Sequence, residues 1–341
     1  MKILIKDILP NESFYSYLSR LYVHSGIANH IEFRKMVFKR SNEYLDYNFV
    51  NVLSDEFMKE INEKIGFENI MLNHTLFKYY VRFLPKDKKL IAWSKALENC
   101  NCLDDYLNLP KYRGNNNLRY CSECVKEDRL KFGESYFHIE HNIQNINYCS
   151  KHCCKLKNTN IEITKSKERN LIPLELVVDD LNTEFIDKDH INIKVAKYNV
   201  GCLNEDIDFD NDKDLSEYLS LNLEDKYISL RGERRYCSLI LKDLKEQFNK
   251  LEVNKITKDR IGWIFRGSYY ATYDVLLLSL FENIDIKDLC RFEGRRRIST
   301  KEFDDKVRKL YNEGRSYNSL GKEFGVNKEV IRKIILGTYD K

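Results

Sequence analysis

The sequence predicts a mostly α-helical, multi-domain protein that contains a small knuckle module built on cysteine and histidine and ends in a helix-turn-helix. Apolar residues recur at helical spacing along much of the chain, which holds only four prolines and thirteen glycines. Two close cysteine and histidine pairs lie between residues 121 and 152, and basic residues accumulate towards residue 341. A length of 341 residues is enough for about two or three domains.

The first predicted segment, residues 1–113, is helical. After Pro10 an apolar stripe follows the i, i+3, i+4, i+7 and i+8 positions of one helix: Phe14, Tyr17, Leu18, Leu21 and Tyr22. Asn11 or Ser13 can cap this helix by accepting a backbone hydrogen bond, and Gly26 ends it. Further helices are expected at about residues 30–38, 54–65 and 90–98.

The second predicted segment, residues 114–160, is a zinc-binding module. It carries the pairs Cys121-x2-Cys124 and Cys149-x2-His152, and two residues between partners let each pair bend around one ion. Four protein ligands complete a tetrahedral Zn²⁺ site, so the expected role of the zinc is structural. The alternative is four unrelated side chains without a metal.

Other cysteines and histidines compete for this assignment. His138 and His141 could replace His152, but neither forms a close pair with Cys149. Cys153 and Cys154 directly follow His152 and are sterically awkward partners for the same ion.

Cys100 and Cys102 form a separate Cys-x-Cys pair upstream. No matching second pair is evident, so we interpret them as ordinary small apolar residues.

The third predicted segment, residues 161–228, is acidic and variable. Residues 175–225 carry 15 Asp and Glu against 4 Lys. We expect a solvated loop; a protein-docking face and a guard against non-specific DNA binding are the alternatives. Short β-prone runs occur at 175–178 and 191–195.

The fourth predicted segment, residues 229–292, returns to helical patterns. A helical stripe is formed by Leu239, Ile240, Leu244 and Phe248. The run from Val275 to Phe281 is apolar enough to be buried.

The last predicted segment, residues 293–341, is a helix-turn-helix. Ser299 and Glu302 suit a capping box that opens a helix ending at Gly314, and shorter helices are expected at 316–324 and 328–336. The predicted outer face of the last helix carries Asn327, Lys328, Glu329, Arg332 and Lys333.

These outer residues suit DNA binding. Asn and Arg can read base edges in the major groove, and Lys can neutralise phosphate. The run Arg295, Arg296 and Arg297 suits phosphate or minor-groove contacts. Residues 291–341 carry 14 Lys and Arg against 8 Asp and Glu, which favours this reading over a packing module with a solvated basic face.

Two motifs carry a family resemblance. The stretch from Pro10 to Leu21, Pro-Asn-Glu-Ser-Phe-Tyr-Ser-Tyr-Leu-Ser-Arg-Leu, resembles the opening signature of the TniQ/TnsD family. The order Cys121-x2-Cys124, Gly133-Glu134, His141 and Cys149-x2-His152 is similar to the zinc-binding core of the same family. Asn142 and Cys153 replace the Gln and Gly common in that family, and the later block 259–281 resembles it more weakly.

The resemblance implies a function. Members of this family select target sites for multi-component bacterial transposons, so we expect a non-enzymatic selector that binds double-stranded DNA. The implied partners are an AAA+ ATPase of the TnsC type and the transposase. An adaptor recruited by an RNA-guided CRISPR complex is the alternative within the family, and the outward basic face favours direct DNA reading.

Two readings lie outside the family. A zinc-containing helix-turn-helix transcription factor would explain the cysteine pairs and the basic end, but not the amino-terminal motif. A nuclease or transposase would need paired carboxylates and Mg²⁺. The acidic residues at 205–214 lack such framing, and no Gly-x4-Gly-Lys-Ser/Thr loop occurs.

Composition bounds the cellular location. A hydrophobic content of 43% with 12% aromatic residues excludes wholesale disorder. The longest apolar run, 275–281, is too short to span a membrane, and residues 1–10 lack a cleavage site. We expect a cytoplasmic protein associated with the bacterial nucleoid, in which ten cysteines favour metal binding over disulfides.

Overall fold

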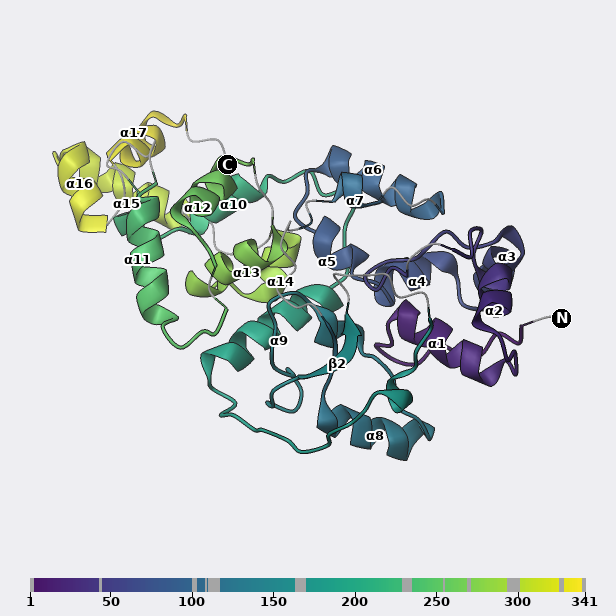
Figure 1. Ribbon diagram of the computed structural model, residues 1–341. Coiled ribbons are helices and arrows are strands. Elements are labelled where there is room, and N and C mark those ends of the chain that lie inside the picture. Colours follow the sequence, from purple (N-terminus) through teal and green to yellow (C-terminus); the bar gives the residue numbers. More distant parts are fainter. Residues whose placement is uncertain are drawn as a thin grey trace. The chain divides into compact units, whose positions relative to one another are not determined.

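The computed structural model describes most of the chain (Figure 1). The described residues are 3–42, 45–99, 103–107, 109, 117–162, 170–228, 235–253, 255–268, 271–292, 301–324 and 328–338. They divide into two compact units. The first is Met1–Asp212 with the short pieces Lys250–Val253 and Ala271–Tyr273, and the second is the remainder. Helices predominate among these residues, which confirms the predicted mostly α-helical class.

The amino-terminal part of the first unit is helical. Its helices are α1 (Phe14–His24), α2 (His30–Val37), α3 (Asp55–Lys64), α4 (Phe67–Asn73), α5 (Phe77–Val81), α6 (Lys86–Leu97) and α7 (Leu103–Tyr106). Ser13 caps α1, because its Oγ accepts from the Ser16 amide at 3.2 Å, and Asn11 instead adopts a positive φ of 56°. The predicted stripe faces the core, although Tyr22 is only half-buried.

A small mixed module follows in the same unit. It comprises β1 (Asn117–Tyr120), α8 (Ser122–Phe132), the 3-10 helix η1 (Ile139–Asn142) and β2 (Lys157–Glu162). β1 pairs antiparallel with β2, with Tyr120 opposite Lys157. Arg119 of β1 is buried, and its guanidinium donates to the carbonyl oxygens of Ile143, at 2.9 Å, and Ile146. Burial lowers the pKa of Arg119 to about 9.

The first unit ends with η2 (Leu174–Leu176) and α9 (Ile191–Asn204). The prediction of β structure at 175–178 and 191–195 was wrong, since the first run overlaps η2 and the second opens α9. His190 caps α9 by accepting from the Asn192 amide at 3.3 Å. The buried positions of α9 recur at helical spacing over fourteen residues, and a five-residue window is too short to reveal that period.

The second unit contains α10 (Leu215–Asn222), η3 (Asp225–Tyr227), α11 (Cys237–Gln247), α12 (Lys258–Phe265), α14 (Ile286–Arg291) and, from Asp274, α13 (Thr272–Phe281). The apolar run of α13 is buried, as predicted. The predicted stripe of α11 is narrower, because Leu239 is exposed while Ile240 and Leu244 are buried.

Three further helices close the described chain, shown in yellow in Figure 1: α15 (Lys301–Asn312), α16 (Tyr317–Phe324) and α17 (Lys328–Leu336). They share a core of Val307, Leu320, Ile331 and Ile334. Gly314, beyond the end of α15, has a φ of 94° that glycine adopts without strain. The turn at residues 325–327 and the predicted cap Ser299 lie outside the described residues.

No helix in the described part of the chain is both long and apolar enough to cross a membrane.

Candidate metal centre and nucleic-acid interface

The candidate metal centre lies where α8 meets the turn before β2. Cys121 precedes α8, and its Sγ accepts from the Cys124 amide at 3.5 Å. Cys149 and His152 lie in the second turn, where the Cys153 amide donates to the Cys149 carbonyl oxygen at 3.0 Å. Each pair is therefore shaped by its own backbone turn.

The structure brings Cys121, Cys124, Cys149 and His152 together, with their donor atoms within 4.8 Å of one another. His152 Nδ1 lies 3.5 Å from Cys121 Sγ, 3.3 Å from Cys124 Sγ and 3.7 Å from Cys149 Sγ. The Cys124 and Cys149 sulfurs are 3.9 Å apart. Zinc bonds of about 2.3 Å to sulfur and 2.0 Å to nitrogen give tetrahedral edges of roughly 3.5–3.8 Å. The cluster could therefore hold a metal ion with little movement.

Burial and hydrogen bonding shift the pKa values of these donor groups. The three cysteines are buried, and His152 is half-buried. Hydrogen bonding to Cys124 lowers the pKa of Cys121 to about 6, and hydrogen bonds from Cys121 and Cys124 lower the pKa of Cys149. Thiolates are the form that binds metal, so these two shifts favour metal binding by Cys121 and Cys149, whereas hydrogen bonding to Cys121 and burial raise the pKa of Cys124.

Glu127 of α8 orients His152. Its carboxylate lies 3.0 Å from His152 Nε2 and also pairs with Lys151. If Nε2 carries the proton and donates to Glu127, the Nδ1 lone pair faces the three sulfurs. Although burial opposes protonation of His152, the hydrogen bond to Glu127 raises its pKa to about 9.

Two residues that sequence spacing disfavoured also approach the cluster. Cys154 Sγ lies 3.3 Å from Cys121 Sγ, because Cys153 adopts a φ of 52° and reverses the chain. His141 is buried with its Nε2 3.6 Å from Cys124 Sγ, and together with Glu140 and Cys149 it forms a second group that could hold a metal ion. The spacing carries no signal for Cys154, since its approach depends on the turn conformation.

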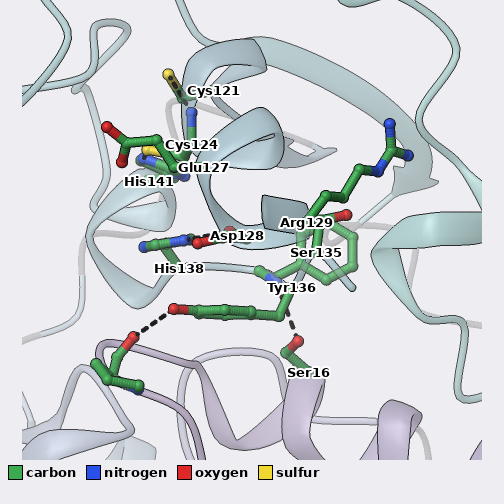
Figure 2. A network of polar contacts seen from close by, with 12 residues as sticks. Ser16, Cys121, Cys124, Glu127, Asp128, Arg129, Ser135, Tyr136, His138 and His141 are labelled. Atoms are coloured by element: carbon green, nitrogen blue, oxygen red, sulfur yellow. Dashed lines mark hydrogen bonds and ion pairs between the residues drawn. The ribbon is translucent and has the colours of Figure 1, made fainter. Parts of the chain in front are cut away.

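His138 has a different role (Figure 2). Its Nε2 lies 2.8 Å from the Asp128 carboxylate, and its ring stacks on Tyr136 with centroids 4.6 Å apart. Asp128 therefore holds His138 beside the metal cluster. Cys100 and Cys102 lie outside the described residues.

A polar network that is buried at Glu12 and Arg20 joins α1 to the candidate metal module. Arg20 donates to Glu12 at 2.7 Å and to Glu134 at 2.9 Å, and His24 lies 3.0 Å from Glu134. Glu12 is fully buried, and burial raises its pKa to about 7 although Arg20 opposes the shift.

Backbone groups complete this joint. The Ser13 amide donates to the Phe137 carbonyl oxygen at 2.9 Å, and the Phe137 amide donates to Ser16 Oγ at 2.9 Å. Tyr136 donates to the Pro10 carbonyl oxygen at 3.0 Å. Figure 2 shows the dashed line from the Tyr136 hydroxyl and the one that ends on Ser16. The polar residues of the amino-terminal motif thus attach α1 to the segment after α8.

The predicted DNA-contacting residues are described only in part. Lys328, Arg332 and Lys333 are exposed on α17, and Glu329 pairs with Arg332 at 3.4 Å. Asn327 and the run Arg295, Arg296 and Arg297 lie outside the described residues. The described cations lie opposite the buried Ile331 and Ile334, so α17 has one apolar and one basic face.

Comparison with known proteins finds a family model that matches part of the chain. Residues 5–156 match the family model TniQ. This span contains α1, the buried joint and all four donors of the metal cluster, but neither α9 nor the helices of the second unit. No curated protein matches the sequence.

Proposed function

Since residues 5–156 of this chain belong to the TniQ family, we propose that the protein selects a transposition target by binding duplex DNA and recruiting the transposition machinery. The TniQ domain is associated with target-site selection in transposons, and the family is one of non-catalytic adaptors and DNA-binding proteins. The match carries the proposal because it includes both the Glu12–Arg20 joint and the metal cluster.

The metal in this proposal is Zn²⁺ with a structural role. Three thiolates and one imidazole at tetrahedral spacing suit zinc, and four protein donors leave no position for a reacting water. When bound, the ion cross-links the start of α8 to the turn before β2. The chain's own residues then hold this module against α1 through Arg20.

The DNA-reading element in this proposal is the helix-turn-helix formed by α16 and α17. Arg332 can donate two hydrogen bonds to a guanine edge, and Lys328 and Lys333 can neutralise phosphates on either side. Arg332 must leave Glu329 to do so, which favours a site where stronger contacts replace that exposed ion pair.

The partner in this proposal is an AAA+ ATPase of the TnsC type, which links the selector to the transposase in the cytoplasm. Recruitment by an RNA-guided CRISPR complex is the second candidate. The exposed cations of α17 favour direct DNA reading over that alternative.

The test pairs a DNA-face variant with a matched control. Arg332→Ala with Lys333→Ala should weaken binding to an insertion-site duplex and reduce the slope of log affinity against log salt by about 1, for the phosphate contact that Lys333 loses. Lys59→Ala with Lys64→Ala removes two exposed charges from α3 and should leave both quantities unchanged. An unchanged salt slope in the α17 variant would count against DNA reading by this helix.

Recruitment needs its own assay. Purified protein and a TnsC-type ATPase should co-assemble on duplex DNA that carries the insertion site, as followed by native gel shift. If the ATPase assembles only when a guide RNA complex is added, the adaptor alternative holds instead.

A further inference from the structure

The acidic segment 205–210 follows α9, precedes the end of the first unit at Asp212, and carries the carboxylates of Glu205, Asp206, Asp208 and Asp210. Its three aspartates are exposed, as in the expected solvated loop. Its backbone and Phe209 nevertheless pack on α6 and on Arg82, the residue that follows α5. We call residues 205–210 the acidic strap.

Three kinds of contact hold the strap. Arg82 donates to the carbonyl oxygen of Asp206 at 2.8 Å and to that of Glu205. Lys86 pairs with Asp210 at 3.2 Å. The ring of Phe209 stacks on Trp93 of α6, with centroids 5.0 Å apart and planes inclined by 23°.

Two cations of the face beneath the strap are buried. Arg82 is 2% exposed and Lys89 is 3% exposed. The strap meets Arg82 with carbonyl dipoles rather than carboxylates, and the buried Nε of Arg82 has no acceptor among the described residues. Burial and the neighbouring charge of Arg82 lower the pKa of Lys89 to about 8, and Asp208 offsets this only in part.

A set of cations beside an aromatic ring, here the half-buried Trp93, is the arrangement that binds single-stranded nucleic acid. Phosphates are stronger partners than carbonyl oxygens for a guanidinium, and bases stack on aromatic side chains in place of another ring. Each strap group has a counterpart in such a ligand: Asp210 on Lys86 corresponds to a phosphate, and Phe209 on Trp93 corresponds to a base.

We propose that Arg82, Lys86, Lys89 and Trp93 form a second nucleic-acid site, for single-stranded DNA, which the acidic strap occupies in the free protein and vacates on binding. The strap lies directly before the boundary between the two units. Its release frees residues 205–212 as tether, a reach of at most about 28 Å for eight extended residues. The proposal is independent of duplex reading by α17.

The chain offers a matched control for the test. In the strap, Asp208 Oδ1 accepts from the Asp210 amide at 2.9 Å, and outside it Asp187 Oδ1 accepts from the Asp189 amide at 2.8 Å. Asp208→Asn with Asp210→Asn and Asp187→Asn with Asp189→Asn therefore change the same charge in the same kind of turn.

The experiment measures binding of a twelve-nucleotide oligo-dT to the full chain. In a Trp263→Phe background the remaining tryptophan, Trp93, reports stacking by fluorescence quenching. The strap variant should bind about tenfold more tightly than the Asp187 and Asp189 control at low salt, because phosphates no longer compete with strap carboxylates. Adding Lys86→Ala and Trp93→Leu to the strap variant, followed by gel shift, should remove that gain.

Two results would overturn the proposal. One is equal oligo-dT affinity in the strap and control variants, which makes the strap ordinary packing. The other is a gain that persists after Lys86→Ala and Trp93→Leu, which places the bound strand elsewhere. Repeating the titration with Arg332→Ala and Lys333→Ala separates this site from α17, since only duplex binding should then fall.

Discussion

Glu12 should make the stability of this protein depend on pH in a way that a single substitution removes. Glu12 is fully buried beside Arg20, and burial raises its pKa from 4.5 to about 7. The folded state therefore binds a proton that the unfolded state has already lost between those two values. Stability from this group is complete below pH 4.5 and is lost as pH rises through 7.

The size of the effect follows from the two pKa values. A rise from 4.5 to about 7 corresponds to about 3.4 kcal/mol in full, of which about 2.5 kcal/mol falls between pH 5 and pH 8. Glu12→Gln removes the titration and keeps the shape of the side chain. The free energy of unfolding of the native protein, minus that of the variant, should fall by about 2.5 kcal/mol over this range.

Urea unfolding, followed by far-ultraviolet circular dichroism at several pH values, measures this difference between the two free energies of unfolding. The contributions of the other titrating groups are common to the native protein and the variant and therefore cancel. Glu134→Gln is the control, because its neighbours lower the pKa of Glu134 despite its burial, so it should not titrate between pH 5 and pH 8. A difference for Glu12→Gln that stays flat within about 1 kcal/mol would refute the assignment of a buried, proton-binding Glu12.

Two predictions concern the metal centre. Cys124→Ser should lose stoichiometric zinc and lower the melting temperature, whereas Cys237→Ser, outside the cluster, should keep its zinc. If elemental analysis of the purified native protein finds no zinc, the assignment of a zinc site is wrong. Glu127→Gln should weaken metal affinity about tenfold to a hundredfold without removing a ligand, because His152 loses its orienting carboxylate. Competition with a chromophoric chelator measures that change, and unaltered affinity would mean that Glu127 does not orient His152.

The helices that the sequence predicted share one property, which is that their evidence is local. The stripe from Phe14 to Leu21 repeats within three turns, and Val307, Leu320 and Ile331 mark the inner faces of three short helices. The helical period of α9 extends over fourteen residues, whereas its first five residues are rich in β-branched side chains and by themselves indicate a strand.

The candidate site was predictable to a similar degree. Two residues between Cys121 and Cys124, and two between Cys149 and His152, limit each pair to one tight turn. The further approach of Cys154 to Cys121 depends on the positive φ of Cys153, which neither composition nor spacing reveals.

The sequence alone therefore determined the helical class, the two cysteine and histidine pairs of the candidate metal centre and the basic helix near the end, because turn chemistry and periodicity act over a few residues. Only the tertiary structure decided that Arg20 pairs both with Glu12 and with Glu134, which lies 114 residues after Arg20, and that the acidic strap covers Arg82 and Trp93. Such contacts form where distant segments pack and exclude water, and the burial then shifts the pKa of each charged group.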